Sequence, residues 1–180
     1  NVRSFSRVNA SLPCGAREGV CAPGMGTNAA FALATQCYQT LMADGRKAKQ
    51  ACDLNMVTPA LENIIEANIL LSGLGFESGG LAAAHGIVDG LTILPGTHKY
   101  MHGEEVAFGT LCHMMLENAP TEELEEVLDF CLDVGLPVCL ADIGVESISP
   151  EELRQVAEKA SIPEESTHAM PFPVNAQTVA

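Results

Sequence analysis

The chain of 180 residues is long enough for one domain with a hydrophobic core, and its apolar fraction of 47% is that of a globular protein. Its formal net charge of -14 repels phosphate backbones and anionic membrane surfaces, which argues against nucleic-acid and membrane partners. The longest apolar runs fall well short of the roughly 20 residues that span a bilayer, so we expect a soluble protein.

The cysteines indicate a reducing compartment. There are seven, an odd number, with no C-x-x-C pair, and most lie among apolar neighbours in helical patterns. They are predicted to be reduced core thiols, which favours the cytoplasm. No signal peptide is recognisable, and the first residue is Asn1 rather than Met, so we expect the chain to begin within a longer protein.

The first predicted elements are a loop and two helices. Residues 1–26 are rich in Ser, Arg, Gly and Pro without a sustained period, which predicts a loop or an insertion. From Thr27 apolar residues recur at helical spacing, and Gly45 is expected to end this helix. Thr58 followed by Pro59 predicts the next start, because a hydroxyl can cap free amides and proline needs no amide partner there. The expected buried stripe of this helix consists of Leu61, Ile64, Ile65 and Ile69.

The middle of the chain is unusual for its small side chains. Glycine and alanine dominate the stretch from Ser78 to Gly90, and a helix this bare would let another backbone or a ligand approach closely. The run from Leu91 to Leu94 is the best strand candidate, but it is short and alone. Glu104 to Asn118 is predicted to be a helix with two carboxylates in its first turn, where the helix dipole favours negative charge.

Two later helices have clear start signals. Thr121 begins a strongly amphipathic pattern, which Gly135 is expected to end. Ser149 and Glu152 form a capping box with Pro150 at the first helical position, which predicts another helix.

The end of the chain resembles a helix without its body, over Asn175 to Ala180. We therefore expect this last helix to be truncated. No segment alternates over enough residues to predict a sheet. The predicted fold class is all-α, a helical bundle.

Two of the five histidines are candidate metal ligands. His85 lies in the small-residue stretch, and His102 precedes the helix expected from Glu104. Histidine is the commonest neutral metal ligand, although by spacing alone a hydrogen-bonded side chain near the core is the more common role. The other three are predicted to be structural: a loop residue, a packed or solvent-facing residue and a turn-stabilising residue, at His98, His113 and His168.

A resemblance to the glycerol dehydrogenases, in the iron-containing alcohol dehydrogenase superfamily, is carried by two long segments. These are NMVTPALENIIEANILLSGLGFESGGLAAAHGIVDGLT (Asn55 to Thr92) and HKYMHGEEVAFGTLCHMMLENAP (His98 to Pro120). The resemblance runs from about Gly24 to the last residues, where THAMP (Thr167 to Pro171) is similar to a family turn. The stretch 7–20 looks inserted relative to the family.

The resemblance implies a two-domain enzyme whose N-terminal α/β half binds NAD and whose C-terminal helical half binds a metal in the cleft between them. Residues 27–180 would be the helical metal-binding domain, without the NAD-binding half. In the family one Asp and two His hold Zn²⁺. The histidines match His85 and His102, and the aspartate motif is expected upstream of Asn1. Phe76 matches a position lining the substrate pocket, with a buried core phenylalanine as the alternative.

The implied activity is NAD-dependent and zinc-dependent oxidation of glycerol to dihydroxyacetone, in a cytoplasmic homo-oligomer; family members often form rings of eight subunits. The isolated chain is expected to be inactive, and iron could replace zinc on the same ligands. Two alternatives stay open: a dehydroquinate synthase-like metal-dependent lyase, and a non-catalytic helical assembly domain.

Overall fold

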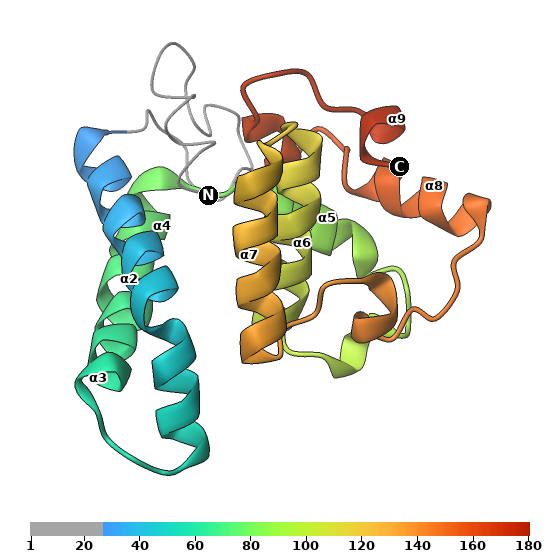
Figure 1. The fold of residues 1–180 in the computed structure, drawn as a ribbon. Helices are drawn as coiled ribbons and strands as arrows, with labels where there is room; N and C mark the ends of the chain where they lie inside the picture. Colours follow the sequence, from blue (N-terminus) through green and yellow to red (C-terminus); the bar gives the residue numbers. More distant parts are fainter. Residues whose placement is uncertain (1–26) are drawn as a thin grey trace. The chain divides into compact units, whose positions relative to one another are not determined.

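The computed structural model describes residues 27–180, which form helices and turns with no β-strand among them (Figure 1). The predicted all-α fold is confirmed for this part of the chain, whereas the predicted loop or insertion at 1–26 lies outside it. The chain divides into two compact units, one up to Gly80 and one from Leu81 to Ala180. Within the described residues, no helix combines the length and apolarity that crossing a membrane requires.

The first unit is a helical hairpin, and its first arm is α2 (Asn28–Asp53). The helix begins as predicted at Thr27, whose Oγ1 accepts a hydrogen bond from the Ala30 amide at 3.1 Å. The predicted stop at Gly45 is wrong, since the helix continues to Asp53 with Gly45 buried in it. One glycine costs a helix only about 1 kcal/mol, which packing along the rest of the helix can offset.

The second arm of the hairpin is continuously helical and contains a π-helical turn. It consists of α3 (Pro59–Glu66), the π turn η1 (Ala67–Leu71) and α4 (Ser72–Gly79), and all three contact α2. The predicted start is confirmed, because the Thr58 hydroxyl accepts from the Leu61 amide at 3.3 Å.

The buried stripe predicted for this arm is only partly present. Leu61 and Ile64 are half-buried, but the side chains of Ile65 and Ile69 are 48% and 74% exposed. Ile69 lies within the π turn, which holds more residues per turn than an α-helix, so a stripe extrapolated at 3.6 residues per turn no longer applies at that position. Ile65 precedes the π turn, on the exposed side of α3.

The small-residue stretch is not one helix, contrary to the prediction. α4 ends at Gly79, Gly80 has a φ of +73°, and α5 (Ala83–Leu91) begins after the extended Ala82. Glycine adopts this backbone region without the steric cost that a Cβ would bring. The break places His85 in the first turn of a new helix.

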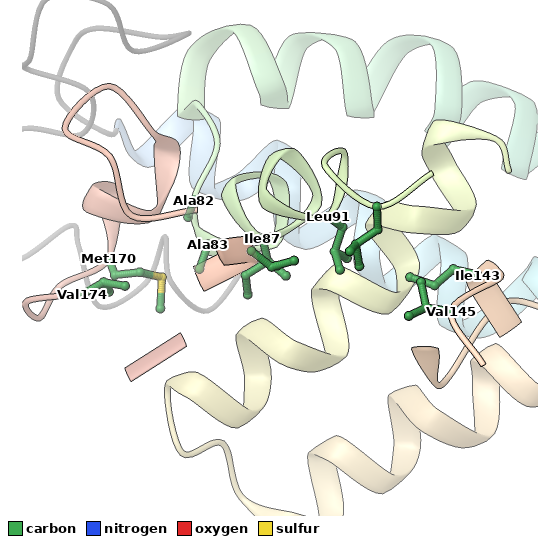
Figure 2. Close-up of a cluster of buried hydrophobic side chains, with 10 residues drawn as sticks. Ala82, Ala83, Ile87, Leu91, Ile143, Val145, Met170 and Val174 are labelled. Atoms are coloured by element: carbon green, nitrogen blue, oxygen red, sulfur yellow. The ribbon is translucent and has the colours of Figure 1, made fainter. Parts of the chain in front are cut away.

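The second unit packs helices around α5. α6 (His102–Leu116) and α8 (Pro150–Lys159) both contact α5, and α7 (Thr121–Val134) contacts α6. Figure 2 shows its cluster of buried apolar side chains. The cluster consists of Ala82, Ala83, Ile87, Leu91, Leu94, Ile143, Val145, Val156, Met170 and Val174. The remaining short elements are η2 (Thr97–Lys99), η3 (Leu140–Ile143), η4 (Ser166–Ala169) and α9 (Ala176–Val179).

Most of the other predicted boundaries are confirmed, and two are wrong. The starts at Thr121 and Ser149 and the short terminal helix are confirmed, and Gly135 ends α7 in the left-handed region at φ +77°. α6 begins earlier than the predicted Glu104, at His102. The strand candidate Leu91 to Leu94 is wrong, because this run is the end of α5 and the turn after it, with Leu94 buried in the core.

Candidate metal centre

Two helices of the second unit bring the predicted histidines together. His85 lies in the first turn of α5 and His102 is the first residue of α6. Their ring centroids are 5.4 Å apart, with the ring planes inclined at 51°. The two imidazoles that the sequence separates by a strand candidate and a loop are thus neighbours.

The separation of these rings suits a shared zinc ion. An imidazole nitrogen lies about 2.0–2.1 Å from Zn²⁺, which puts the ring centroid roughly 3.2 Å from the metal and two tetrahedral ligands' centroids roughly 5 Å apart. The observed 5.4 Å between the His85 and His102 centroids agrees with that distance.

Small residues hold α5 and α6 close enough for this pairing. A Cβ added at Gly109 of α6 would lie 2.5 Å from the Ala84 carbonyl oxygen and 3.0 Å from Val88 Cγ2 of α5. The Ala84 side chain is itself buried. The expectation that the small-residue stretch admits another backbone is therefore confirmed, and the backbone is that of the helix carrying His102.

The surroundings of His85 favour its neutral form. Burial lowers the pKa of His85, the neighbouring His102 lowers it further, and the Asp89 carboxylate opposes the change. The Nδ1 atom is buried and has no hydrogen-bond partner in the described part of the chain. A neutral imidazole with a free nitrogen is the form that ligates metal ions.

The described donor set contains two nitrogens. Among residues 27–180, no group of three or more His, Cys, Asp and Glu side chains is arranged to hold a metal ion. Catalytic zinc sites have three protein ligands and an open position. The pair supplies two nitrogen donors at a spacing that would suit zinc, one protein ligand fewer than such a site has, and the aspartate expected upstream of Asn1 stays a prediction.

The other histidines have structural contacts, as predicted. His98, on η2, has its Nε2 2.8 Å from the Thr92 carbonyl oxygen. His168 has its Nε2 3.1 Å from the Ser161 carbonyl oxygen, which ties a turn together. His113 is buried on α6, with its Nε2 3.7 Å from Glu117 Oε2.

Phe76 lies on α4, in the first unit, and its side chain is 46% exposed. This exposure contradicts the alternative of a buried core phenylalanine. Its role in a substrate pocket stays a prediction.

Sequence reasoning missed the contacts that surround His85. The Ser166 hydroxyl donates to the Ala82 carbonyl oxygen at 3.0 Å, and Thr167 packs against Gly86. These residues are about 80 positions apart, so no local period could reveal the contact; the similarity of THAMP to a family turn was the available signal.

The chain is similar to proteins named glycerol dehydrogenase. It is 54% identical over 155 residues to that of Thermotoga maritima, covering 86% of this chain and 43% of the relative. It is 53% identical over 169 residues to that of Escherichia coli O6:H1, covering 94% and 44%. No family model matches the chain.

A solved structure resembles it as well, that of a probable glycerol dehydrogenase from Sinorhizobium meliloti 1021. The TM-score is 0.88 at 44% sequence identity, over 99% of this chain and 48% of that structure. The chain spans less than half the length of these curated relatives.

Proposed function

We propose that this chain, which is homologous to glycerol dehydrogenases over nearly its whole length, is the metal-binding helical half of an NAD-dependent, zinc-dependent enzyme that oxidises glycerol to dihydroxyacetone. The observation that carries the proposal is the pairing of His85 and His102 at a separation suited to one zinc ion. The names of the relatives supply the substrate class, a small polyol.

The role of the two histidines follows from their position and charge state. Both imidazoles lie at the beginnings of two helices, where each can supply a nitrogen ligand, and burial lowers the pKa of His85, which favours its neutral, metal-binding form. When bound, zinc would act as a Lewis acid toward an alcohol oxygen of the substrate.

In this proposal the third metal ligand and the NAD site lie outside the described residues. We assign the third ligand, the expected aspartate, and the NAD site to the upstream half that the resemblance implies. Phe76 is proposed to line the substrate pocket. We further propose a cytoplasmic homo-oligomer, with small molecules rather than nucleic acid or membrane as partners.

The test of this proposal is an assay of the chain joined to the upstream half of its own polypeptide. We expect NADH formation with glycerol, its loss on treatment with a zinc chelator and its return on adding Zn²⁺. His85→Ala and His102→Ala should each lower kcat/KM at least a hundredfold, whereas His98→Ala should leave it within a few-fold.

Turnover that is insensitive to chelators would remove zinc from the proposal. Activity on a phosphorylated sugar acid, with no polyol oxidised, would favour the dehydroquinate synthase-like lyase instead. Equilibrium dialysis that finds no bound metal would support the non-catalytic assembly domain.

A further inference from the structure

Three consecutive residues, Glu165, Ser166 and Thr167, contact α5 on either side of His85. The first of these contacts is a hydrogen bond to a residue that precedes His85 in the sequence. The Ser166 hydroxyl donates to the carbonyl oxygen of Ala82, the residue that precedes α5, at 3.0 Å. Both residues are buried, so the bond is shielded from water.

The second contact lies beside the histidine. A Cβ added at Gly86 would be 2.6 Å from Thr167 Cγ2 and 2.9 Å from the Thr167 amide nitrogen. Thr167 is fully buried, and its hydroxyl donates to the Ala160 carbonyl oxygen at 2.6 Å. Thr167 is therefore hydrogen-bonded to the C-cap residue of α8, and it packs closely against Gly86, the residue after His85.

The third contact lies one turn after the histidine. The carboxyl of Glu165 lies near enough to that of Asp89 to interact with it electrostatically, and the Lys159 ammonium donates to Glu165 Oε1 at 3.2 Å. Ala82, Gly86 and Asp89 are spaced four and three residues apart, the spacing of neighbours along one side of a helix. The segment thus supports α5 before, beside and after His85.

We propose that the segment Glu165–Thr167 is a positioning element that fixes the first turn of α5, so that the His85 ring faces His102 at the distance one zinc ion requires. This inference rests on the proposed metal-binding function and adds the residues that orient one ligand. Such supporting contacts decide ligand geometry because a ligand ring is only as fixed as the backbone that carries it.

A purely structural role predicts a different result, and Thr97 supplies the matched control. Thr97 is also a fully buried threonine whose hydroxyl donates to backbone carbonyl oxygens, those of Leu94 at 3.1 Å and Leu91 at 3.4 Å. It supports the last turn of α5, at the opposite end from His85. Loss of its hydroxyl removes a comparable contact without touching the ligand.

The experiment compares Ser166→Ala and Thr167→Val with Thr97→Val in the complete chain. The measurements are the Zn²⁺ dissociation constant, by competition with a chromogenic chelator, and the visible absorption spectrum with Co²⁺. We expect Ser166→Ala and Thr167→Val to weaken Zn²⁺ binding about tenfold and to change the Co²⁺ spectrum, as loss of a supporting contact does in other sites. Thr97→Val should keep the wild-type spectrum and an affinity within twofold.

A metal-free measurement separates this inference from the proposed function. In the apo chain, the nuclear Overhauser effect between the His85 and His102 rings should be strong in the wild type and in Thr97→Val, and weak in Ser166→Ala. If the wild type binds no Zn²⁺, the proposed function fails and this inter-ring signal still decides the positioning role. An inter-ring signal equally strong in all variants, or a Zn²⁺ affinity lowered equally in all, overturns the inference.

Discussion

A buried imidazole nitrogen without a hydrogen-bond partner is costly to a folded protein, and the His85 Nδ1 atom is such a group. Leaving a buried polar group unsatisfied costs about 1–3 kcal/mol. The cost is reasonable where the atom serves a ligand, so the feature supports the candidate site at the level of a single atom.

The first prediction concerns this cost. His85→Leu should abolish Zn²⁺ binding and raise the free energy of unfolding of the metal-free chain by about 1 kcal/mol, because an apolar side chain needs no partner there. His98→Leu is the control, since it removes a ring that contacts the Thr92 carbonyl oxygen at 2.8 Å and should lower stability instead. Urea titration of the apo variants measures both; a His85→Leu chain less stable than wild type would contradict the account.

The second prediction concerns the contact between α5 and α6. Gly109→Ala should lower the free energy of unfolding by about 2–3 kcal/mol, because its methyl group would be driven into the Ala84 carbonyl oxygen. The same change should separate the two imidazoles and weaken Zn²⁺ binding. Gly103→Ala, in the same helix with no atom within 4 Å of the new methyl, should gain up to about 0.5 kcal/mol. Equal effects of the two substitutions would count against the close packing described here.

The third prediction concerns Glu165 and pH. Burial raises the pKa of the Glu165 carboxyl above its usual 4.5, the hydrogen bond from Lys159 opposes this, and the Asp89 carboxylate adds to it. A raised carboxyl pKa means that the protonated form favours folding, so its stabilisation is complete below pH 4.5 and is lost as pH rises through the raised pKa.

Glu165→Gln, which imitates the protonated carboxyl, should therefore match wild type at acidic pH and exceed it at neutral pH. The expected gain is roughly a few tenths of a kcal/mol, because the hydrogen bond from Lys159 offsets much of the effect of burial. Thermal unfolding at a series of pH values tests this, and a variant that loses stability at neutral pH relative to wild type would show that the Lys159 ion pair dominates.

At the scale of elements, most helix starts could be predicted from sequence, whereas predictions of which glycine ends a helix were right at Gly135 and wrong elsewhere. Thr58 and Ser149 mark starts because a cap is a local contact between residues three apart. Thr121 begins α7 without a side-chain cap, after Pro120. Gly45 was expected to stop a helix and Gly80 was not, yet the structure has the reverse. Whether a glycine ends a helix depends on what packs around it, which is a property of distant segments.

In the candidate site, too, the sequence predicts some features and does not reveal others. His85 and His102 were identified through the family resemblance, since their spacing alone favours an ordinary structural role. Their proximity depends on the close packing of Gly109 against the Ala84 carbonyl oxygen. The hydrogen bond from Ser166 to Ala82 joins residues that are 84 positions apart in the sequence. Neither contact leaves a periodic pattern in the sequence.

The fourth prediction belongs to this scale and concerns the capping box of α8. The Ser149 hydroxyl accepts from the Glu152 amide at 3.2 Å, and the Glu152 carboxylate accepts from the Ser149 amide at 2.9 Å. Ser149→Ala should lower the free energy of unfolding by about 1 kcal/mol, while the exposed Ser147→Ala changes it by less than about 0.5 kcal/mol. Chemical denaturation measures both, and indistinguishable curves would show that α8 is held by packing alone.

At the scale of the whole molecule, the two units differ in how they bury apolar surface. In the first unit, the buried apolar residues that the structure describes are the alanines Ala30, Ala48, Ala51 and Ala67. The second unit has larger buried side chains around α5, including Ile87, Leu91, Ile143 and Met170. The candidate ligands thus stand on the unit with the more substantial core, which suits a site that must hold fixed distances.

The homology, the separation of the rings and the lowered pKa of His85 lead to one central claim, that His85 and His102 bind the same zinc ion. X-ray absorption spectroscopy at the zinc edge of the zinc-loaded chain tests it most directly. We predict scattering from two imidazoles with nitrogens about 2.0–2.1 Å from zinc, reduced to one in either His85→Ala or His102→Ala. A zinc environment without imidazole, or one that neither substitution changes, would contradict the claim.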